Sequence, residues 1–217
     1  MSVLHAGNVV LPIALLGLLG GCAGGLLGSG GKPSELYRFG ALESGEPTVQ
    51  VSNVQRTVAL ERVHFAPEIE GDRILAVHDG SARYIKGSRW VTAAPSLFAY
   101  AVVQSFQSRA PGLRITASQH GELTGYSLMI YISRFEAQYQ DAGMVLPPVI
   151  AIEGDATLYG LADRQVISQR HFVTRVAATE NRAGAIAATF DHATTGYVAD
   201  VVDWVTALDA LQRTRKH

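Results

Sequence analysis

The residues that could perform chemistry are few and scattered along the chain. Ser127 lies in Gly125-Tyr126-Ser127-Leu128-Met129, which is similar to the turn that carries a hydrolase nucleophile but lacks its final glycine. The seven histidines include no pair with the spacing of a zinc-binding helix, and a single cysteine excludes a cysteine cluster. Gly31-Lys32 is followed by proline, so no phosphate-binding loop is present. We therefore expect no catalytic residue, no metal site and no cofactor.

Two groups of acidic residues could be imagined as ligands. Glu68-Ile69-Glu70-Gly71-Asp72 lacks the regular ligand alternation of a calcium loop, which favours a solvated turn. Asp200 and Asp203 are three residues apart and would share a helix face. Such pairs are usually exposed to water, so neither group changes the expectation.

Cys22 is the exception, because its position gives its thiol a definite chemistry. Val9 to Leu19 is an apolar run of 11 residues, too short for a membrane-spanning helix of about 20 residues but typical of a signal peptide. Leu19-Gly20-Gly21-Cys22 resembles the lipobox of bacterial lipoproteins, although Met1 to Asn8 contains neither lysine nor arginine. The sequence predicts a signal peptide over residues 1–21 and attachment of diacylglycerol to Cys22.

The remaining chain divides into a tether and one domain. Residues 22–33 are rich in glycine, which favours a lipidated tether over a packed helix. No second linker or internal repeat follows, so residues 34–217 are expected to form a single domain. The formal net charge is −1 and only 17% of residues are charged, which argues against a nucleic-acid partner.

Alternating and periodic apolar residues predict an α/β fold with a mixed, mostly antiparallel sheet flanked by helices. Tyr126–Phe135 is apolar on both faces, which predicts a central strand covered on both sides. A tight turn at His78-Asp79-Gly80-Ser81 and a second hairpin around Gly160–Arg164 are expected. Further strands are predicted over Ser34–Leu42, Val58–Phe65, Arg73–Val77, Ala82–Ile85, Leu113–Ala117, Val149–Tyr159 and Gln165–Val176.

Two helices are predicted. The first begins at Pro95 and ends near Ser108, before Pro111-Gly112. The second is a long C-terminal helix whose apolar residues recur every three or four positions, with a kink allowed at Gly196. The stripe, read as a core face, comprises Ile186, Phe190, Ala193, Tyr197, Val201, Trp204, Leu208 and Leu211.

Several segments, taken in order and spacing, resemble the ABC-type transport auxiliary lipoproteins, the group that includes the PqiC-like proteins. The segments are Gly71-Asp72-Arg73-Ile74-Leu75, Ala82-Arg83-Tyr84-Ile85, Arg89-Trp90, Ile130–Ala137, Val166–Phe172 and Asp203-Trp204-Val205. The resemblance implies an α/β domain without catalytic residues. It also implies partnership with a mammalian-cell-entry (MCE) type lipid transporter, made of an MCE protein, a permease and an ATPase.

The resemblance further implies a place on the periplasmic side of the cell envelope, held by the lipid anchor. Ala23 after the cysteine favours the outer membrane over the inner. Asp72, Arg73, Arg89 and Trp90 match the family, and either a structural or a partner-binding role fits them, since arginine and tryptophan often anchor interfaces.

Two alternatives stay open at this point. The chain could be a lipid-carrying lipoprotein with its own apolar cavity, in which Met129 and Met144 would be lining candidates. An envelope hydrolase using Ser127 is the less favoured alternative. The sequence leaves the transported lipid, the direction of transport and homo-oligomerisation undecided.

Overall fold

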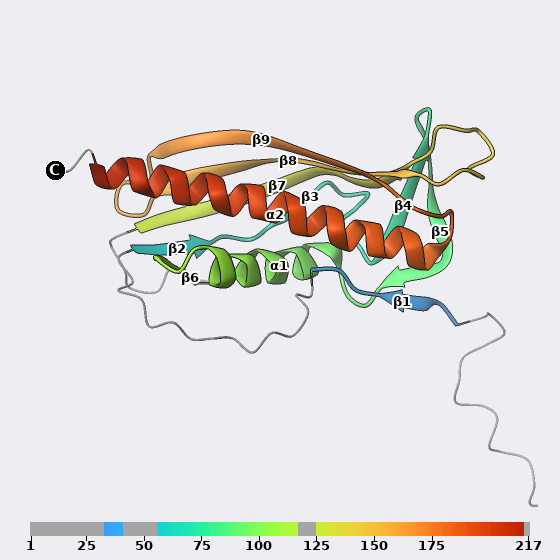
Figure 1. Ribbon diagram of the computed structural model, residues 1–217, viewed down its shortest axis with the longest axis horizontal. Coiled ribbons are helices and arrows are strands. Elements are labelled where there is room, and N and C mark those ends of the chain that lie inside the picture. The colour runs from blue at the N-terminus through green and yellow to red at the C-terminus, as the bar shows by residue number, and fades with distance from the viewer. Residues whose placement is uncertain (1–32, 41–55, 117–124, 215–217) are drawn as a thin grey trace, which may run out of the picture. The chain divides into compact units, whose positions relative to one another are not determined.

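The computed structural model describes residues 33–40, 56–116 and 125–214, and all of these except Pro33 belong to the folded unit Ser34–His217 (Figure 1). Within these residues, nine strands form one sheet accompanied by two helices. In chain order they are β1 (Glu35–Tyr37), β2 (Arg56–Leu60), β3 (His64–Phe65), β4 (Arg73–His78), β5 (Ser81–Trp90), α1 (Ala94–Arg109), β6 (Leu113–Thr116), β7 (Gly125–Gln138), β8 (Val149–Gly160), β9 (Val166–Ala177) and α2 (Ala183–Thr214).

Strand β7 is the centre of the sheet, as its apolar sequence predicts. One edge of β7 pairs antiparallel with β8, which in turn pairs with β9. The other edge is shared by three shorter strands, β2, β3 and β4, all parallel to β7. Beyond them, β6 extends β2, while β5 and then β1 extend β4. The sheet is mixed and most of its registered residue pairs are antiparallel, which confirms the predicted fold class.

Both helices pack on the same face of β7. The ring of Phe98 in α1 lies 6.5 Å from the ring of Phe135, and the ring of Phe190 in α2 lies 4.7 Å from it. The predicted cover on both faces is therefore wrong. On the opposite face Tyr131 is 41% exposed, and Arg134 forms a 2.6 Å ion pair with Glu153 of β8. Met129, Tyr131 and Phe135 made that face look apolar in the sequence. The register shift between Ile132 and Arg134 places Phe135 on the helix face instead, and the neighbours on β8 and β9 are polar.

Most strand boundaries agree with the sequence, and the differences have local causes. The strand expected over 58–65 is divided into β2 and β3, which pair with successive parts of β7. Strand β5 continues to Trp90, well past Ile85, because β4 and β1 pair with it on its two edges. The expected tight turn is present, with positive φ at Asp79 (46°) and Gly80 (76°). Of the strand expected over Ser34–Leu42, the structure contains only β1 (Glu35–Tyr37). The last residue of the expected strand, Leu42, lies outside the described residues.

Helix α1 has Pro95 in its first turn, as predicted, and buries a face that includes Leu97, Phe98 and Phe106. Helix α2 spans 32 residues and runs unbroken through Gly196. Its apolar stripe is buried from Ile186 to Trp204, but Leu208 is only half-buried and Leu211 is 59% exposed. The core face thus ends earlier than the periodicity indicates, because in the last turns of α2 it is Asp209, and not Leu211, that faces the sheet.

An aromatic cluster joins the helices to the sheet. Phe135 of β7 is 2% exposed and lies at its centre. Its ring contacts five others, those of Phe39, Phe65, Trp90, Phe98 and Phe190, at centroid separations from 4.7 to 6.5 Å. Edge-on and tilted aromatic pairs of this kind add to the free energy of burial. The cluster therefore holds the segment after β1, together with β3, β5, α1 and α2, against one strand.

A buried carboxylate fastens the C-terminal half of α2 to the sheet. Asp209 is 1% exposed, and its Oδ1 accepts hydrogen bonds from Arg56 Nη1 of β2 and from the hydroxyl of Tyr126 of β7, both at 3.0 Å. Arg213 Nη2 forms an ion pair with Oδ2 at 2.5 Å. A carboxylate at this depth needs such partners, because burial without them is costly.

We expect Phe135→Ala to lower the free energy of unfolding by about 3–5 kcal/mol, because it removes a buried ring from five neighbours. Urea denaturation of purified protein measures the change. Tyr131→Ala, an exposed aromatic on the same strand, is the matched control and should cost less than about 1 kcal/mol. Equal losses in the two variants would contradict the placement of the core.

Tyr197 of α2 gives a pH prediction. Its hydroxyl is buried without a hydrogen-bond partner among the described residues, and burial, assisted by nearby Asp155, raises its pKa well above 10. The folded state therefore holds this proton more tightly than the unfolded state does. The contribution of the protonated Tyr197 to the free energy of unfolding is fully present below pH 10, the ordinary pKa of tyrosine. It is lost as the pH rises from there towards the raised pKa of the folded state.

Tyr197→Phe should leave stability at pH 7 unchanged or increased, because no hydrogen bond to a described residue is lost. Above pH 10 its free energy of unfolding should fall less steeply than that of the wild type, by up to about 1.4 kcal/mol per pH unit. Chemical denaturation at pH 7 and between pH 10 and 11 measures both. A variant clearly weaker at pH 7 would mean that the hydroxyl is bonded in solution.

Candidate docking surface

The residue with the clearest predicted chemistry, Cys22, lies outside the described residues, as does the glycine-rich segment up to residue 32. The described chain begins one residue before Ser34, the residue at which the domain was expected to start. The structure therefore bears on the other predicted site residues, Asp72, Arg73, Arg89 and Trp90. All four come from β4, β5 and the residue before β4.

Asp72 and Arg89 meet as an exposed ion pair. Nη1 of Arg89 donates to both carboxylate oxygens of Asp72, at 2.9 and 3.0 Å, and the two side chains are 46% and 43% exposed. The backbone joins the same residues, because Trp90 N–H donates to the carbonyl of Asp72 at 2.7 Å. An ion pair this exposed contributes at most about 1 kcal/mol to stability.

Arg73 lies beside this pair and stacks on an aromatic ring. Its guanidinium carbon is 3.6 Å from the ring centroid of Tyr84, whose hydroxyl donates to the carbonyl of Glu68 at 3.0 Å. Arg73 and Arg89 are register partners in β4 and β5, and Arg89 is also registered with Leu36 of β1, which is 61% exposed. Two oriented guanidinium groups and an apolar side chain therefore share one exposed face, which we call the docking surface (Asp72, Arg73, Tyr84, Arg89 and Leu36).

Trp90 does not belong to this surface, which corrects its inclusion among the partner-binding candidates. Its side chain is 2% exposed and its ring packs against Phe39 at 4.9 Å and Phe190 at 5.3 Å. The reason is the alternation of side chains along β5, since Arg89 points outward and the next residue must point inward. Trp90 therefore supports the docking surface by packing in the core on the other face of β5. The sequence reasoning missed Tyr84 and Leu36. Alternation counted back from Arg89 would place Tyr84, five residues away, on the other face, and the register shift of the β4–β5 pair and the pairing of β1 with β5 are visible only in the structure.

The other residues considered as catalytic or ligand-binding candidates make polar contacts with neighbouring side chains in the structure. Ser127 is inside β7 rather than on a turn, is fully buried, and donates to Glu61 Oε1 at 2.6 Å. His171 is on β9, with Nδ1 3.2 Å from Asp155 Oδ1. Asp203 of α2 forms an exposed 2.7 Å ion pair with Arg109 of α1. In the described part of the chain, no three histidine, cysteine or acidic residues cluster in a way that could hold a metal ion.

An open groove of about 700 Å³ lies between α1 and the segment of residues 60–65 that follows from β2 into β3. Its lining mixes apolar side chains such as Val103 with the charged Glu61, Arg62 and Glu70. Met144, a candidate for lining a lipid cavity, instead packs against the core, and Met129 is half-buried on the opposite face of the sheet. The described helices include none that is long and apolar enough to cross a membrane.

Two solved structures share this fold. A Xanthomonas campestris protein of the DUF330 family superposes with a TM-score of 0.70 at 21% identity, covering 83% of this chain and 99% of its own. A second, uncharacterised protein gives a TM-score of 0.63 at 13% identity, covering 80% and 99%. At these identities the likeness concerns the fold. No curated protein matches the chain significantly.

The sequence itself matches a family model over residues 41–202, which is most of the chain. The matched region extends from before β2 into α2 and contains the whole β4–β5 hairpin with Asp72, Arg73 and Arg89. That family consists of lipoproteins that accompany ABC-type transporters. The chain belongs to the family of ABC-type transport auxiliary lipoprotein components.

Proposed function

We propose that this protein is the periplasmic, lipid-anchored auxiliary component of an MCE-type ABC transporter that moves phospholipid or another hydrophobic substrate across the envelope. The family match over residues 41–202 carries the proposal, since it associates the chain with an ABC transporter. The MCE protein is the partner implied by the resemblance of the sequence. The role is binding and placement rather than catalysis.

The lipid anchor supplies the placement. Diacylglycerol on the Cys22 thiol, with a further acyl group, would give stable membrane attachment, whereas one acyl chain binds only marginally. Ala23 supports the outer membrane as the destination. The anchor would hold the folded unit beside the transporter without a membrane-spanning helix.

The docking surface supplies the binding. Arg73 and Arg89 are held by a ring and by a carboxylate, so they lose little side-chain freedom when a partner binds. Arginine beside tyrosine is the composition typical of residues that dominate interface energies. Acidic or carbonyl groups on the MCE protein would be suitable acceptors for the guanidinium N–H groups that remain.

We expect Cys22→Ser to abolish acylation and membrane retention, because the serine hydroxyl is a far weaker nucleophile than a cysteine thiolate. Incorporation of labelled palmitate and fractionation of membranes washed with high salt measure the two effects. The folded unit should be unaffected by far-ultraviolet circular dichroism. Labelled, membrane-bound Cys22→Ser protein would contradict the assignment of the anchor.

Arg89→Ala should reduce recovery of the MCE component by affinity purification in mild detergent at least about tenfold, the effect of losing one interface anchor of 1.4 kcal/mol or more. Its unfolding free energy should change by less than about 1 kcal/mol.

Arg109→Ala is the matched control, because Arg109 is equally exposed (44%) and equally ion-paired but lies on α1. It should leave recovery unchanged. If Arg89→Ala and Arg109→Ala behave alike, the docking surface is placed wrongly. If wild-type protein recovers no MCE component at all, the proposed partnership itself fails.

A further inference from the structure

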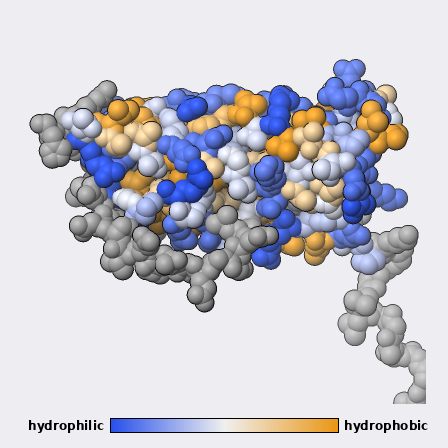
Figure 2. Space-filling view, viewed as in Figure 1, coloured by the Kyte–Doolittle hydropathy of each residue, from blue (hydrophilic) through white to orange (hydrophobic). Residues whose placement is uncertain are grey.

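The loop between β7 and β8 presents aliphatic side chains to solvent. Residues 142–148 include no charged side chain, and Val145 and Leu146 are 72% and 57% exposed. Figure 2 shows hydrophobic side chains in orange over this end of the folded unit, next to the hydrophilic tip of the β4–β5 hairpin. Exposed neighbouring aliphatic residues at a loop tip are unusual on a soluble surface and indicate a contact.

The side chains of Asp141, Asn181 and Tyr139 hold this loop in one conformation. The carboxylate of Asp141 accepts hydrogen bonds from the backbone N–H groups of Val145 at 2.7 Å and Leu146 at 3.2 Å. The amide of Asn181 donates to the carbonyls of Met144 and Val145 at 2.7 and 2.9 Å, and is itself held by the hydroxyl of Tyr139. The exposure of the two aliphatic side chains is therefore a fixed feature of the fold, and binding through them costs little ordering entropy.

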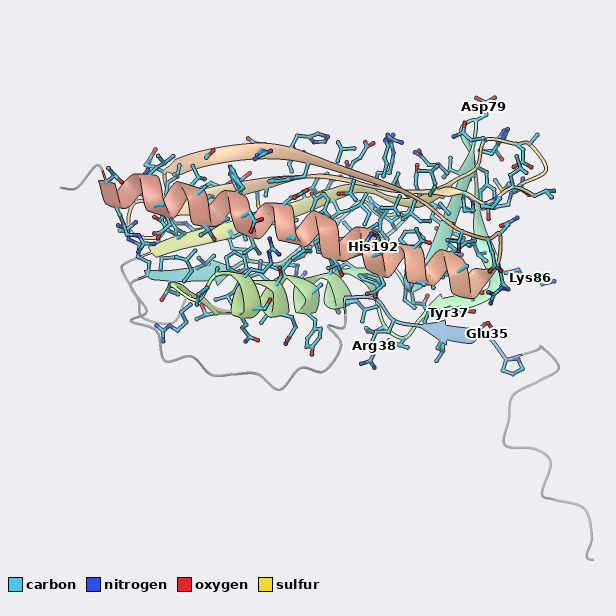
Figure 3. All side chains as sticks on the ribbon, viewed as in Figure 1. Glu35, Tyr37, Arg38, Asp79, Lys86 and His192 are labelled. Atoms are coloured by element: carbon cyan, nitrogen blue, oxygen red, sulfur yellow. The ribbon has the colours of Figure 1, made fainter. Side chains whose placement is uncertain are left out.

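The same end of the folded unit is where the chain enters it. Asn181 lies two residues before α2, and in the first turn of α2 Gly184 is close enough to Tyr37 of β1 that an added Cβ would touch the tyrosine ring. Figure 3 shows Glu35 of β1 and the exposed Lys86 of β5 at this end, and Figure 1 shows the β7–β8 loop there as well. Cys22 is twelve residues before Ser34, a length of chain that spans at most about 40 Å.

We propose that the β7–β8 loop inserts Val145 and Leu146 into the interface of the bilayer that holds the acyl chains of Cys22; this rests on the proposed lipidation. The occupant is a lipid surface because residues 142–148 are uncharged and expose two aliphatic side chains at the end where the chain enters the folded unit. The carboxylate of Asp141 is occupied by backbone N–H groups of the loop, and Lys86 at the same end suits anionic headgroups. A second, weak membrane contact beside an acyl anchor would fix the direction in which the folded unit faces. The C-terminal end of α2 then points away from the bilayer.

A fluorescent label at one position of the lipidated, full-length chain tests whether the β7–β8 loop enters the bilayer. Because Cys22 is the only cysteine in the sequence and is blocked once acylated, Val145→Cys carries one free thiol. It is labelled with the polarity-sensitive fluorophore NBD, and the protein is reconstituted into vesicles of phosphatidylethanolamine and phosphatidylglycerol. Leu211→Cys is the matched control, since Leu211 is a 59% exposed leucine in the last turns of α2, roughly 40 Å along the helix from its first turn.

We expect NBD at position 145 to shift its emission to the blue in vesicles and to be quenched by spin labels on the lipid chains. NBD at position 211 should do neither. Emission at 145 that stays as water-exposed as at 211 overturns the proposal, while intact mass showing the acylated N-terminus confirms that the anchor itself is in place. Shielding at 145 in native membranes but not in pure lipid vesicles would also overturn it, because a protein would then cover the loop.

Discussion

The packing of aromatic rings around Phe135 is the interaction on which the rest of the structure depends. Strand β7 is paired on both edges, and the ring of Phe135 on its inner face contacts both helices. The same cluster includes Phe39, next to β1, and Trp90 at the end of β5. Elements that are far apart in the chain are thereby positioned by contacts with a single strand.

The docking surface depends on that core through the alternation of β5. Trp90 packs into the aromatic cluster, so its neighbour Arg89 must face outward. There Arg89 binds Asp72 and lies beside its register partner Arg73. The favourable burial of Trp90 thus fixes the direction in which the charged side chain of Arg89 points. A surface built this way can change its exposed residues without altering the core, and solved structures of 21% and 13% identity do share this fold.

Several polar groups that are buried in this fold join one element to another. Asp209 joins α2 to β2 and β7, and Ser127 binds Glu61 inside the sheet. On the open face of the sheet, Glu153 lies between Arg134 and Arg175. Such networks engage residue types, among them Ser127, that a sequence search flags as catalytic candidates.

The sequence by itself determined the class of fold, the long C-terminal helix, the two hairpins and the central strand, because these follow from local periodicity and turn chemistry. It also predicted the anchor at Cys22, which depends on a linear motif. Only the tertiary structure decided that both helices lie on one face, that Trp90 is core while Arg89 is surface, and that Leu211 is exposed. The rigid exposure of Val145 likewise depends on Asn181, 36 residues away. Those outcomes require knowing which distant residues become neighbours, and no local pattern carries that information.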